Sequence, residues 1–370
     1  MVDPLDLVLI ARHGFGYPPL GEWHLSRALA ARGHRVLYVE PPPAARKLPL
    51  TATRRWREAP VRRLAPRLLA TQPLALPRAD QPGWARASDA LIGRQVARIV
   101  RSVFPTPPVV VTFDPRRGSL PAVPRQALVH WRRDRFAAMT NLPGVERLAA
   151  RDEALMRAAD LVCGTVPALV EEAEALGANA ALVPNGCDVA HFETPRARPT
   201  ALPRGDAVLG FAGGAPWRLD RKLIAAVADQ RPTWQLVFVG PTASDLPERA
   251  NVHAVGPVRY DEIPSWLQHF DIGLVPYDMA IALNATSFPL KALEYLAAGT
   301  PAVATPMPAL IDFAPHVRTA STPAEFIRAA EAALTEGPTA VECRALASAN
   351  TWEQRADQFT AEIAQLELMP

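Results

Sequence analysis

Two side chains one helical turn apart, Lys291 and Glu294, are the best candidates for chemistry in this sequence. They lie in the segment SFPLKALEYLAAGTPAVAT, residues 287–305, where Pro289 suits the first turn of a helix and Gly299 suits its end. A helix amino terminus presents free N–H groups and a positive dipole end to a diphosphate. Lys291 would add positive charge there, and Glu294 could accept hydrogen bonds from two ribose hydroxyls. The same spacing also fits a surface ion pair on an ordinary helix, and spacing alone does not separate the two interpretations.

Length and composition limit the classes of protein that the chain can belong to. A chain of 370 residues exceeds what one hydrophobic core usually supports, so we expect two domains. Hydrophobic residues make up 49% and charged residues 21%, which fits a globular protein with buried parallel sheets. The net charge of +3 is too small to indicate a nucleic-acid partner.

Cysteine usage and the apolar segments favour a cytoplasmic protein. The three cysteines, Cys163, Cys187 and Cys343, are odd in number and widely spaced, which argues against a disulfide framework and a cysteine-based metal site. No apolar run reaches the length of a membrane-spanning helix. The first 17 residues, MVDPLDLVLIARHGFGY, have no basic region before the apolar stretch and predict a first strand rather than a signal peptide.

Apolar strands and helical segments alternate along the chain, as in βαβ units with a parallel sheet. The expected strands are residues 5–10, 36–39, 109–113, 127–130, 160–163, 181–183, 207–212, 235–239, 252–255, 272–275 and 302–304. The expected helices are residues 21–32, 85–103, 144–159, 166–176, 221–229, 261–269, 290–298 and 323–334. The pattern predicts an α/β fold with two Rossmann-like, doubly wound parallel-sheet domains.

A turn-rich segment, residues 191–206, is the expected linker between the domains. We therefore expect an N-terminal domain over residues 1–195, a C-terminal domain over residues 206–350 and a terminal helical segment over residues 351–370. Open parallel sheets bind ligands at the carboxyl ends of their strands, so a cleft between the domains is the expected site. His13, Gly14, Phe15 and Gly16 follow the first strand at such an end, where glycines let the backbone approach an acceptor or the donor phosphates. A tight strand–helix turn is the alternative.

A basic segment within residues 41–80 has a composition unlike the rest of the chain. Between residues 46 and 78 it contains nine lysines and arginines interleaved with apolar residues, and only one carboxylate. Such a segment could contact anionic lipid headgroups at the inner face of the membrane, or a phosphorylated acceptor. An ordinary solvated surface loop is the alternative.

The block around Lys291 resembles the donor-binding signature of retaining, GT-B-fold glycosyltransferases of the GT4-like group, especially members that assemble bacterial polysaccharides. Four further segments resemble motifs of that group in the same order: residues 25–41, 160–192, 251–277 and 351–359. Together the five segments are much more specific than any one of them. The resemblance implies a GT-B fold whose C-terminal helix crosses back to the first domain.

The resemblance also implies a hexosyltransferase-type enzyme that moves a sugar from a UDP or GDP sugar to a hydroxyl acceptor, with retention at the anomeric carbon and without a metal or other cofactor. The acceptor would belong to a cell-envelope glycan, a lipid-linked intermediate or a natural product. By the resemblance, Glu294 would bind the ribose, Lys291 and residues 287–290 the phosphates, and residues 256–259 the base. The candidate donor-binding residues are Gly213, Gly214, Arg218, Lys222, Gly256, Val258, Asn284, Thr286, Ser287, Phe288, Pro289, Leu290, Lys291 and Glu294.

The sequence departs from the resemblance at two places. Thr286 stands where many members have a second glutamate that contacts the sugar, so Asn284 is a candidate for that contact. The expected Arg–Lys pair after the first strand of the second domain is incomplete, and Arg218 or Lys222 is the candidate substitute. Each of these two could instead be an ordinary surface charge.

Three residues of the first domain are candidate catalytic residues. His130 and Asp134 follow a strand where the group often has a functional histidine or aspartate, and Asp114 follows the preceding strand. An imidazole or carboxylate there could orient the acceptor hydroxyl or stabilise positive charge on the sugar. Each could equally be structural.

Three other functions compete with glycosyl transfer. A nucleotide-sugar epimerase would share the fold and the donor pocket. A dinucleotide-dependent oxidoreductase would use Glu40 for a ribose, although HGFGYPPLG lacks the full glycine spacing. A non-catalytic assembly protein would account for the departure at Thr286.

Overall fold

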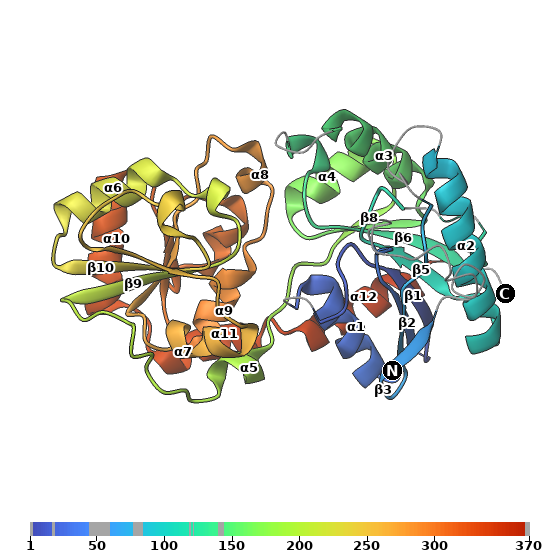
Figure 1. Cartoon of the computed structure of the whole chain (residues 1–370), viewed down its shortest axis with the longest axis horizontal. Helices are drawn as coiled ribbons and strands as arrows, with labels where there is room; N and C mark the ends of the chain where they lie inside the picture. Colours follow the sequence, from blue (N-terminus) through green and yellow to red (C-terminus); the bar gives the residue numbers. More distant parts are fainter. Residues whose placement is uncertain are drawn as a thin grey trace. The chain divides into compact units, whose positions relative to one another are not determined.

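The computed structural model describes residues 3–16, 19–43, 60–76, 84–117, 120, 122–139 and 144–366. These residues form two compact units (Figure 1). The first unit comprises Met1–Pro184 and Arg355–Pro370, and the second comprises Asn185–Gln354. The two α/β domains expected from the alternating pattern are confirmed.

The described part of the first unit contains an eight-stranded sheet in the order β3-β4-β2-β1-β5-β6-β7-β8. Its strands are β1 (Asp6–Ile10), β2 (Arg35–Val39), β3 (Val61–Ala65), β4 (Leu68–Thr71), β5 (Val109–Thr112), β6 (Ala127–Arg132), β7 (Leu161–Gly164) and β8 (Ala180–Leu182). Strands β3 and β4 pair antiparallel, and the other neighbours pair parallel. The helices are α1 (Gly21–Ala31), α2 (Trp84–Val103), α3 (Val145–Ala158), α4 (Pro167–Ala175) and most of α12 (Trp352–Ala364).

The second unit contains a parallel six-stranded sheet in the order β11-β10-β9-β12-β13-β14. Its strands are β9 (Ala207–Ala212), β10 (Trp234–Val239), β11 (Val252–Gly256), β12 (Ile272–Val275), β13 (Ala302–Ala304) and β14 (Val317–Thr319). Its helices are α5 (Val189–Glu193), α6 (Arg221–Gln230), α7 (Ile263–Leu267), α8 (Ala282–Ala285), α9 (Leu290–Ala298), α10 (Pro323–Glu336) and α11 (Ala340–Ser348). Short 3-10 turns complete it, among them η3 (Pro216–Arg218).

Each sheet reverses its strand order beside its first strand, so β1 lies between β2 and β5, and β9 lies between β10 and β12. In a doubly wound sheet this reversal leaves a crevice at the carboxyl ends of the two strands, where ligands bind. The crevice of the first unit is therefore bounded by the residues after β1 and β5. That of the second unit is bounded by the residues after β9 and β12.

Two features differ from the expectations, and a third, the terminal helix, agrees with them. The basic segment contains the antiparallel strands β3 and β4, whose first strand is largely exposed and carries arginines in place of an apolar pattern. Residues 44–59 and 77–83 of that segment lie outside the described residues. The first unit ends at Pro184 rather than at residue 195, because α5 packs within the second unit and buries Phe192 in its core. The terminal helix α12 begins in the second unit, and from Arg355 onward it belongs to the first.

Helix α9 packs unusually closely on the sheet of the second unit. Gly273 of β12 faces the ring of Tyr295, and a Cβ at this glycine would lie 2.3 Å from the Tyr295 Cδ2 atom. The Tyr295 hydroxyl donates to the Leu274 carbonyl at 3.0 Å and accepts from the Ala212 N–H at 3.0 Å. This packing determines how far the first turn of α9 stands above β9 and β12.

We predict that Gly273→Ala lowers the free energy of unfolding by about 1–3 kcal/mol, because the added methyl group must displace a fully buried ring. Urea denaturation of the full chain measures the change. Gly214→Ala is the matched control, since a Cβ there meets no atom within 4 Å. Equal stability of the two variants would contradict the close packing of α9.

Candidate functional site

The amino end of α9 brings Lys291 to the crevice of the second unit. Its Nζ atom hydrogen-bonds the Tyr277 hydroxyl. The same atom lies 4.7 Å from the centroid of the Tyr277 ring and 4.8 Å from that of Phe211. Tyr277 follows β12 and Phe211 lies on β9, so both strands at the reversal position the lysine.

Arg218 supplies a second positive charge beside Tyr277. Its guanidinium carbon lies 4.5 Å from the Tyr277 ring centroid, and its Nε atom donates to the Asn284 Oδ1 atom at 2.6 Å. The Asn284 amide in turn donates to the Asp278 carbonyl at 2.7 Å. The Nη2 atom of Arg218 is buried and has no hydrogen-bond partner among the described residues. A buried guanidinium nitrogen without an acceptor is costly, so an anionic ligand would stabilise this arrangement.

The first turn of α9 leaves its backbone donors open. In the part of the chain that the structure describes, no side chain caps this helix, and its first turn contains no acidic residue. The Ser287 hydroxyl donates to the Leu283 carbonyl at 2.6 Å, and the Thr286 hydroxyl donates to the same carbonyl at 3.4 Å. The uncapped start of α9 therefore presents the positive end of a helix to an anion.

Glycines at the carboxyl ends of the strands keep this region accessible. A Cβ at Gly213 would lie 3.1 Å from the Lys291 Cε atom. A Cβ at Gly240, whose φ is 112°, would lie 2.2 Å from the Gly213 carbonyl oxygen. Gly214 faces open space, which leaves room for a ligand beside the lysine.

The electrostatics of the crevice favour a bound anion. Burial alone would raise the pKa of Tyr277, but the positive charges of Lys291 and Arg218 outweigh it, and the pKa is lowered. Burial raises the pKa of Glu294 to about 7, and the positive charge of Lys291 only partly opposes this shift. The site thus contains two cations close together and one carboxylate that ionises reluctantly.

The remaining candidates of the second unit do not join this cluster. Lys222 is exposed at the start of α6. Gly256 has a φ of 78° and faces open space, and Val258 packs against the core. Asn284 is committed to Arg218 and Asp278, so it positions the arginine instead of offering a free amide to a sugar. Tyr277 was not among the candidates, although its place directly after a buried strand could have indicated it.

In the first unit, the loop after β1 lies at the crevice. The Phe15 N–H donates to the Glu40 Oε1 atom at 2.8 Å, and a Cβ at Gly14 would lie 3.5 Å from the same oxygen. The His13 Nδ1 atom lies 2.7 Å from the Glu22 Oε1 atom. Glu40 therefore supports the loop that contains Gly16, whose φ is 88°.

Burial opposes ionisation of Glu22, but Arg133 and His13 outweigh it and lower its pKa to about 2. The Arg133 guanidinium lies 2.5 Å from the Glu22 Oε2 atom. Glu22 therefore carries a negative charge that holds His13 and Arg133 beside the end of β1.

The three catalytic candidates of the first unit lie in different surroundings. His130 is fully buried, with Nε2 2.7 Å from an Asp152 oxygen and Nδ1 3.2 Å from the Thr112 carbonyl. We therefore revise its assignment to a structural one. Asp114 lies after β5 and binds the Arg116 Nε atom at 2.8 Å. Asp134 is half-buried beyond β6.

Arg12, which the sequence did not indicate, lies between these groups. Burial lowers its pKa, and among the described residues its only hydrogen-bond partner is the Met139 sulfur at 3.9 Å. Asp134 and Asp114 act on it through space. The crevice of the first unit thus contains a cation that a ligand anion would complement.

The described residues contain no group of three histidine, cysteine or acidic side chains that could hold a metal ion. None of the described helices is long and apolar enough to span a membrane.

Residues 208–336 match the family model of glycosyl transferases group 1, so the second unit carries a domain of that family. The Bacillus subtilis (strain 168) protein TuaH, named for glycosyl transfer in teichuronic acid biosynthesis, is 40% identical over 112 residues. That match spans 28% of this chain and 28% of the relative.

Solved structures of the GT-B type share the fold of the whole chain. Sucrose-phosphate synthase from Thermosynechococcus elongatus has a TM-score of 0.68 at 17% identity. The match covers 98% of this chain and 99% of the synthase chain. Anabaena Alr3699/HepE in complex with UDP and glucose has a TM-score of 0.67 at 15% identity. The match covers 98% of this chain and 100% of the HepE chain. The GT-B fold implied by the sequence motifs is therefore confirmed.

We predict that Glu294→Gln gains stability relative to the wild type as the pH rises. The raised pKa of Glu294 means that the folded protein binds its proton more tightly than the unfolded chain does, so the wild type loses stability between pH 4.5 and about 7. The glutamine removes this loss, which we expect to be on the order of 3 kcal/mol. Urea denaturation of both proteins at several pH values measures the difference.

The control for this comparison is Glu336→Gln, at an exposed position on α10. This variant should follow the pH dependence of the wild type. A constant difference between Glu294→Gln and the wild type across the range would show that Glu294 ionises normally.

Proposed function

We propose that this chain is a glycosyltransferase that moves a sugar from a nucleoside diphosphate sugar to a hydroxyl acceptor. The observation that carries the proposal is the buried, unpartnered Nη2 atom of Arg218, beside Lys291 and the uncapped amino end of α9. Three positive groups converge there, and a diphosphate has the charge and size to contact all of them. The family domain at residues 208–336 contains every one of these groups.

In the proposed reaction, the bond between the anomeric carbon and the diphosphate oxygen breaks, and the nucleoside diphosphate leaves with the electron pair. Arg218, Lys291 and the α9 dipole would stabilise the charge that develops on this leaving group. The acceptor hydroxyl forms the new bond to the anomeric carbon, and its proton passes to an oxygen of the leaving nucleoside diphosphate. These cations could take the part that a metal ion plays at the diphosphate of other nucleotide-sugar enzymes, which supports metal-independent transfer. Retention at the anomeric carbon remains part of the proposal on the resemblance of the sequence motifs alone.

Glu294 is the proposed ribose ligand, because it lies on the same helix one turn beyond Lys291. Its raised pKa would fall when ribose hydroxyls donate to the carboxylate, since these bonds favour the charged form. Residues 256–259, at the end of β11, are proposed to flank the base of a UDP or GDP donor. The complexes of HepE with UDP and with UDP-glucose support a nucleotide donor of this kind.

The acceptor is proposed to bind the first unit, near the ends of β1 and β5. Arg12, Asp114 and Asp134 are the groups there that could contact it. The name of the B. subtilis relative supports an acceptor from cell-envelope polysaccharide assembly. Such a reaction would take place in the cytoplasm, at the inner face of the membrane where the acceptor is lipid-linked.

We predict that UDP or GDP binds the full chain and that Arg218→Ala and Lys291→Ala each weaken binding about tenfold or more, because each removes a charged contact to phosphate. Titration calorimetry measures the affinity, and a thermal melt confirms folding. Lys222→Ala is the matched control and should bind like the wild type, since Lys222 is exposed away from the cluster.

Three outcomes would overturn this assignment. Binding of neither nucleotide by the wild type would remove the donor site. If Lys222→Ala lost nucleotide binding and Arg218→Ala did not, Lys222 and not Arg218 would be the residue that contacts the phosphate. An epimerised sugar, formed from the donor without any acceptor, would identify an epimerase instead.

A further inference from the structure

A cavity lies in the first unit, whereas the proposed nucleotide site belongs to the second. Its volume is about 540 Å³, and it is formed by α2, the segment after β5, and α3. The polar residues that line it are Arg86, Asp89, Arg116, Arg117 and Arg151. The apolar residues that line it are Ala90, Pro115, Leu120, Ala154, Leu155 and Ala158, with Ala158 at the end of α3.

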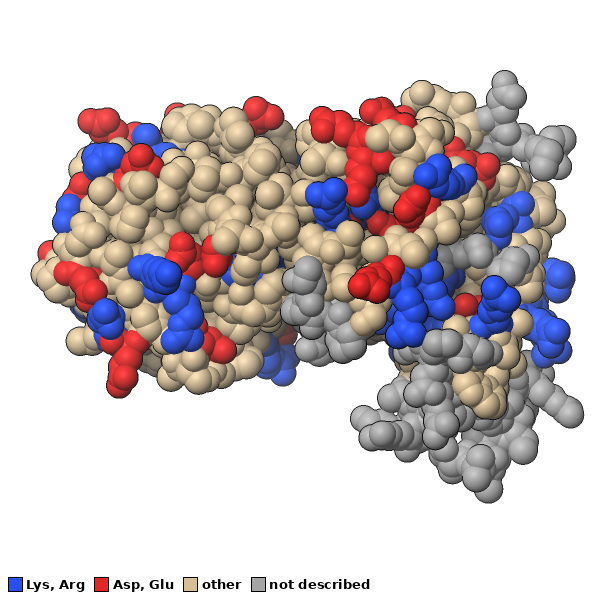
Figure 2. Space-filling model, turned by 90° about the horizontal axis from the view of Figure 1, so that it is seen from above, with Lys and Arg blue, Asp and Glu red and all other residues tan. Residues whose placement is uncertain are grey.

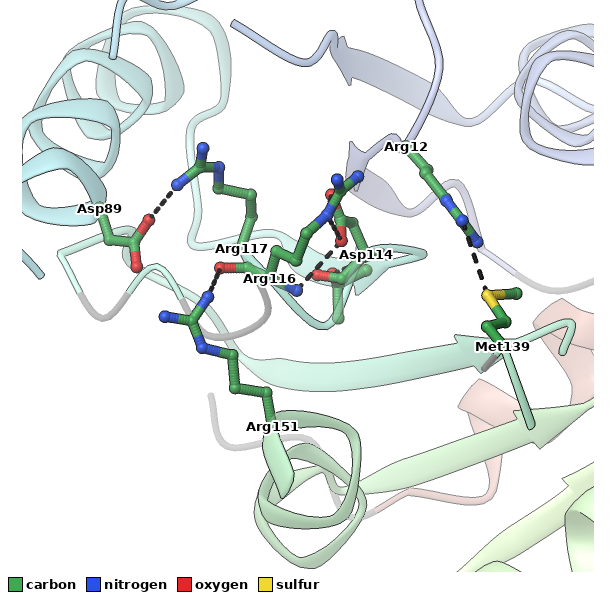
Figure 3. Close-up of polar contacts among 8 residues, drawn as sticks. Arg12, Asp89, Asp114, Arg116, Arg117, Met139 and Arg151 are labelled. Atoms are coloured by element: carbon green, nitrogen blue, oxygen red, sulfur yellow. Dashed lines mark hydrogen bonds and ion pairs between the residues drawn. The ribbon is translucent and has the colours of Figure 1, made fainter. Parts of the chain in front are cut away.

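Two of these arginines are held by carboxylates. The Arg117 Nη1 atom donates to an Asp89 oxygen at 2.8 Å, and the Arg116 Nε atom donates to an Asp114 oxygen at 2.8 Å (Figure 3). The pair of Arg117 with Asp89 connects α2 to the segment after β5, and the pair of Arg116 with Asp114 lies within that segment. They hold the two guanidinium groups in place, so little side-chain entropy would be lost when a ligand binds.

The other two arginines have no such partner. The Arg151 Nη1 atom donates to the Arg116 carbonyl at 3.3 Å, which brings its guanidinium from α3 toward the segment after β5 (Figure 3). Within the described residues, neither Arg151 nor Arg86 forms an ion pair with a carboxylate. The lining therefore has four cations and one carboxylate, and two of the cations are uncompensated.

The charge of the whole unit reinforces this excess. The first unit contains 27 lysines and arginines and 19 acidic residues, a net charge of +8. The second contains 13 and 18, a net charge of −5. Figure 2 shows a group of basic side chains on the first unit. Such a field draws anions toward the first unit before any contact forms.

We propose that this cavity binds the phosphate group of a ligand that has an apolar portion next to the phosphate. A phosphate carries more than one negative charge and several acceptor oxygens, so it can contact guanidinium groups that reach it from separate elements. The alanine, leucine and proline surfaces would bury the neighbouring hydrocarbon. A lipid phosphate and a soluble phosphate ester share this chemistry.

The proposal does not depend on the nucleotide site, because the residues of the two sites belong to different units. Charge reversal in the cavity should leave UDP or GDP binding unchanged. Failure of one proposal is thus distinguishable from failure of the other in the same set of variants.

The test compares wild type with the double variant Arg86→Glu/Arg151→Glu. One arm titrates n-butyl phosphate by calorimetry, and the other measures cosedimentation with phosphatidylglycerol vesicles, with phosphatidylcholine vesicles as the neutral reference. We expect the variant to lose about tenfold or more in affinity in one arm, because two charged contacts are removed. The arm that responds identifies a soluble ester or a lipid as the source of the phosphate.

Two further variants keep the result interpretable. Arg86→Lys/Arg151→Lys retains both charges and should keep a substantial part of the affinity, while a thermal melt checks that each variant folds. Arg94→Glu reverses an exposed charge on α2 outside the cavity lining and should bind like the wild type. The proposal is overturned if neither probe binds, or if binding in both arms is the same in wild type and double variant.

Discussion

The second unit holds two cations close together, and within the described residues no carboxylate forms an ion pair with either. Lys291 and Arg218 both lie against the ring of Tyr277, and the Asn284 side chain orients the guanidinium from its other side. Aromatic faces and a neutral amide attract a cation without neutralising it. A bound anion would therefore offset the repulsion between the two cations.

This constraint explains why the surrounding chain is packed so tightly. The lysine occupies its position because α9 approaches β12 over a glycine, and because Gly213 has no side chain in its way. Gly240 in turn leaves room for the Gly213 carbonyl. A site with unfavourable electrostatics persists only where the scaffold is rigid enough to resist relaxation. The Tyr295 hydroxyl, bonded to both β9 and β12, provides that rigidity below the site.

The sequence could predict the parts of the site that are encoded locally. Lys291 and Glu294 share one helix, and their spacing with Pro289 and Gly299 is readable without a structure. The pairing of Arg218 with Asn284 joins residues 66 positions apart, so no local pattern contains it. The sequence left open whether His130 is catalytic or structural, because a residue late in a buried strand can point into the interior as easily as into a crevice; β6 runs on to Arg132, so His130 lies within the strand. Its bond to Asp152 of α3 decides the matter.

The fold was predictable for a related reason. Buried parallel strands are apolar along their whole length and stand out in the sequence, whereas the exposed strand β3 is rich in arginine and does not.

The sequence also could not show which residues contact the sugar, because that depends on contacts between side chains. The hydroxyl of Thr286 turns back to the Leu283 carbonyl, and the amide of Asn284 is occupied by Arg218 and Asp278. Both side chains therefore serve to shape the turn before α9 and to position its neighbouring cation. Recognition of the sugar must accordingly come from backbone groups of that turn or from residues outside it, and this separates the generic nucleotide contacts from whatever determines which sugar is transferred.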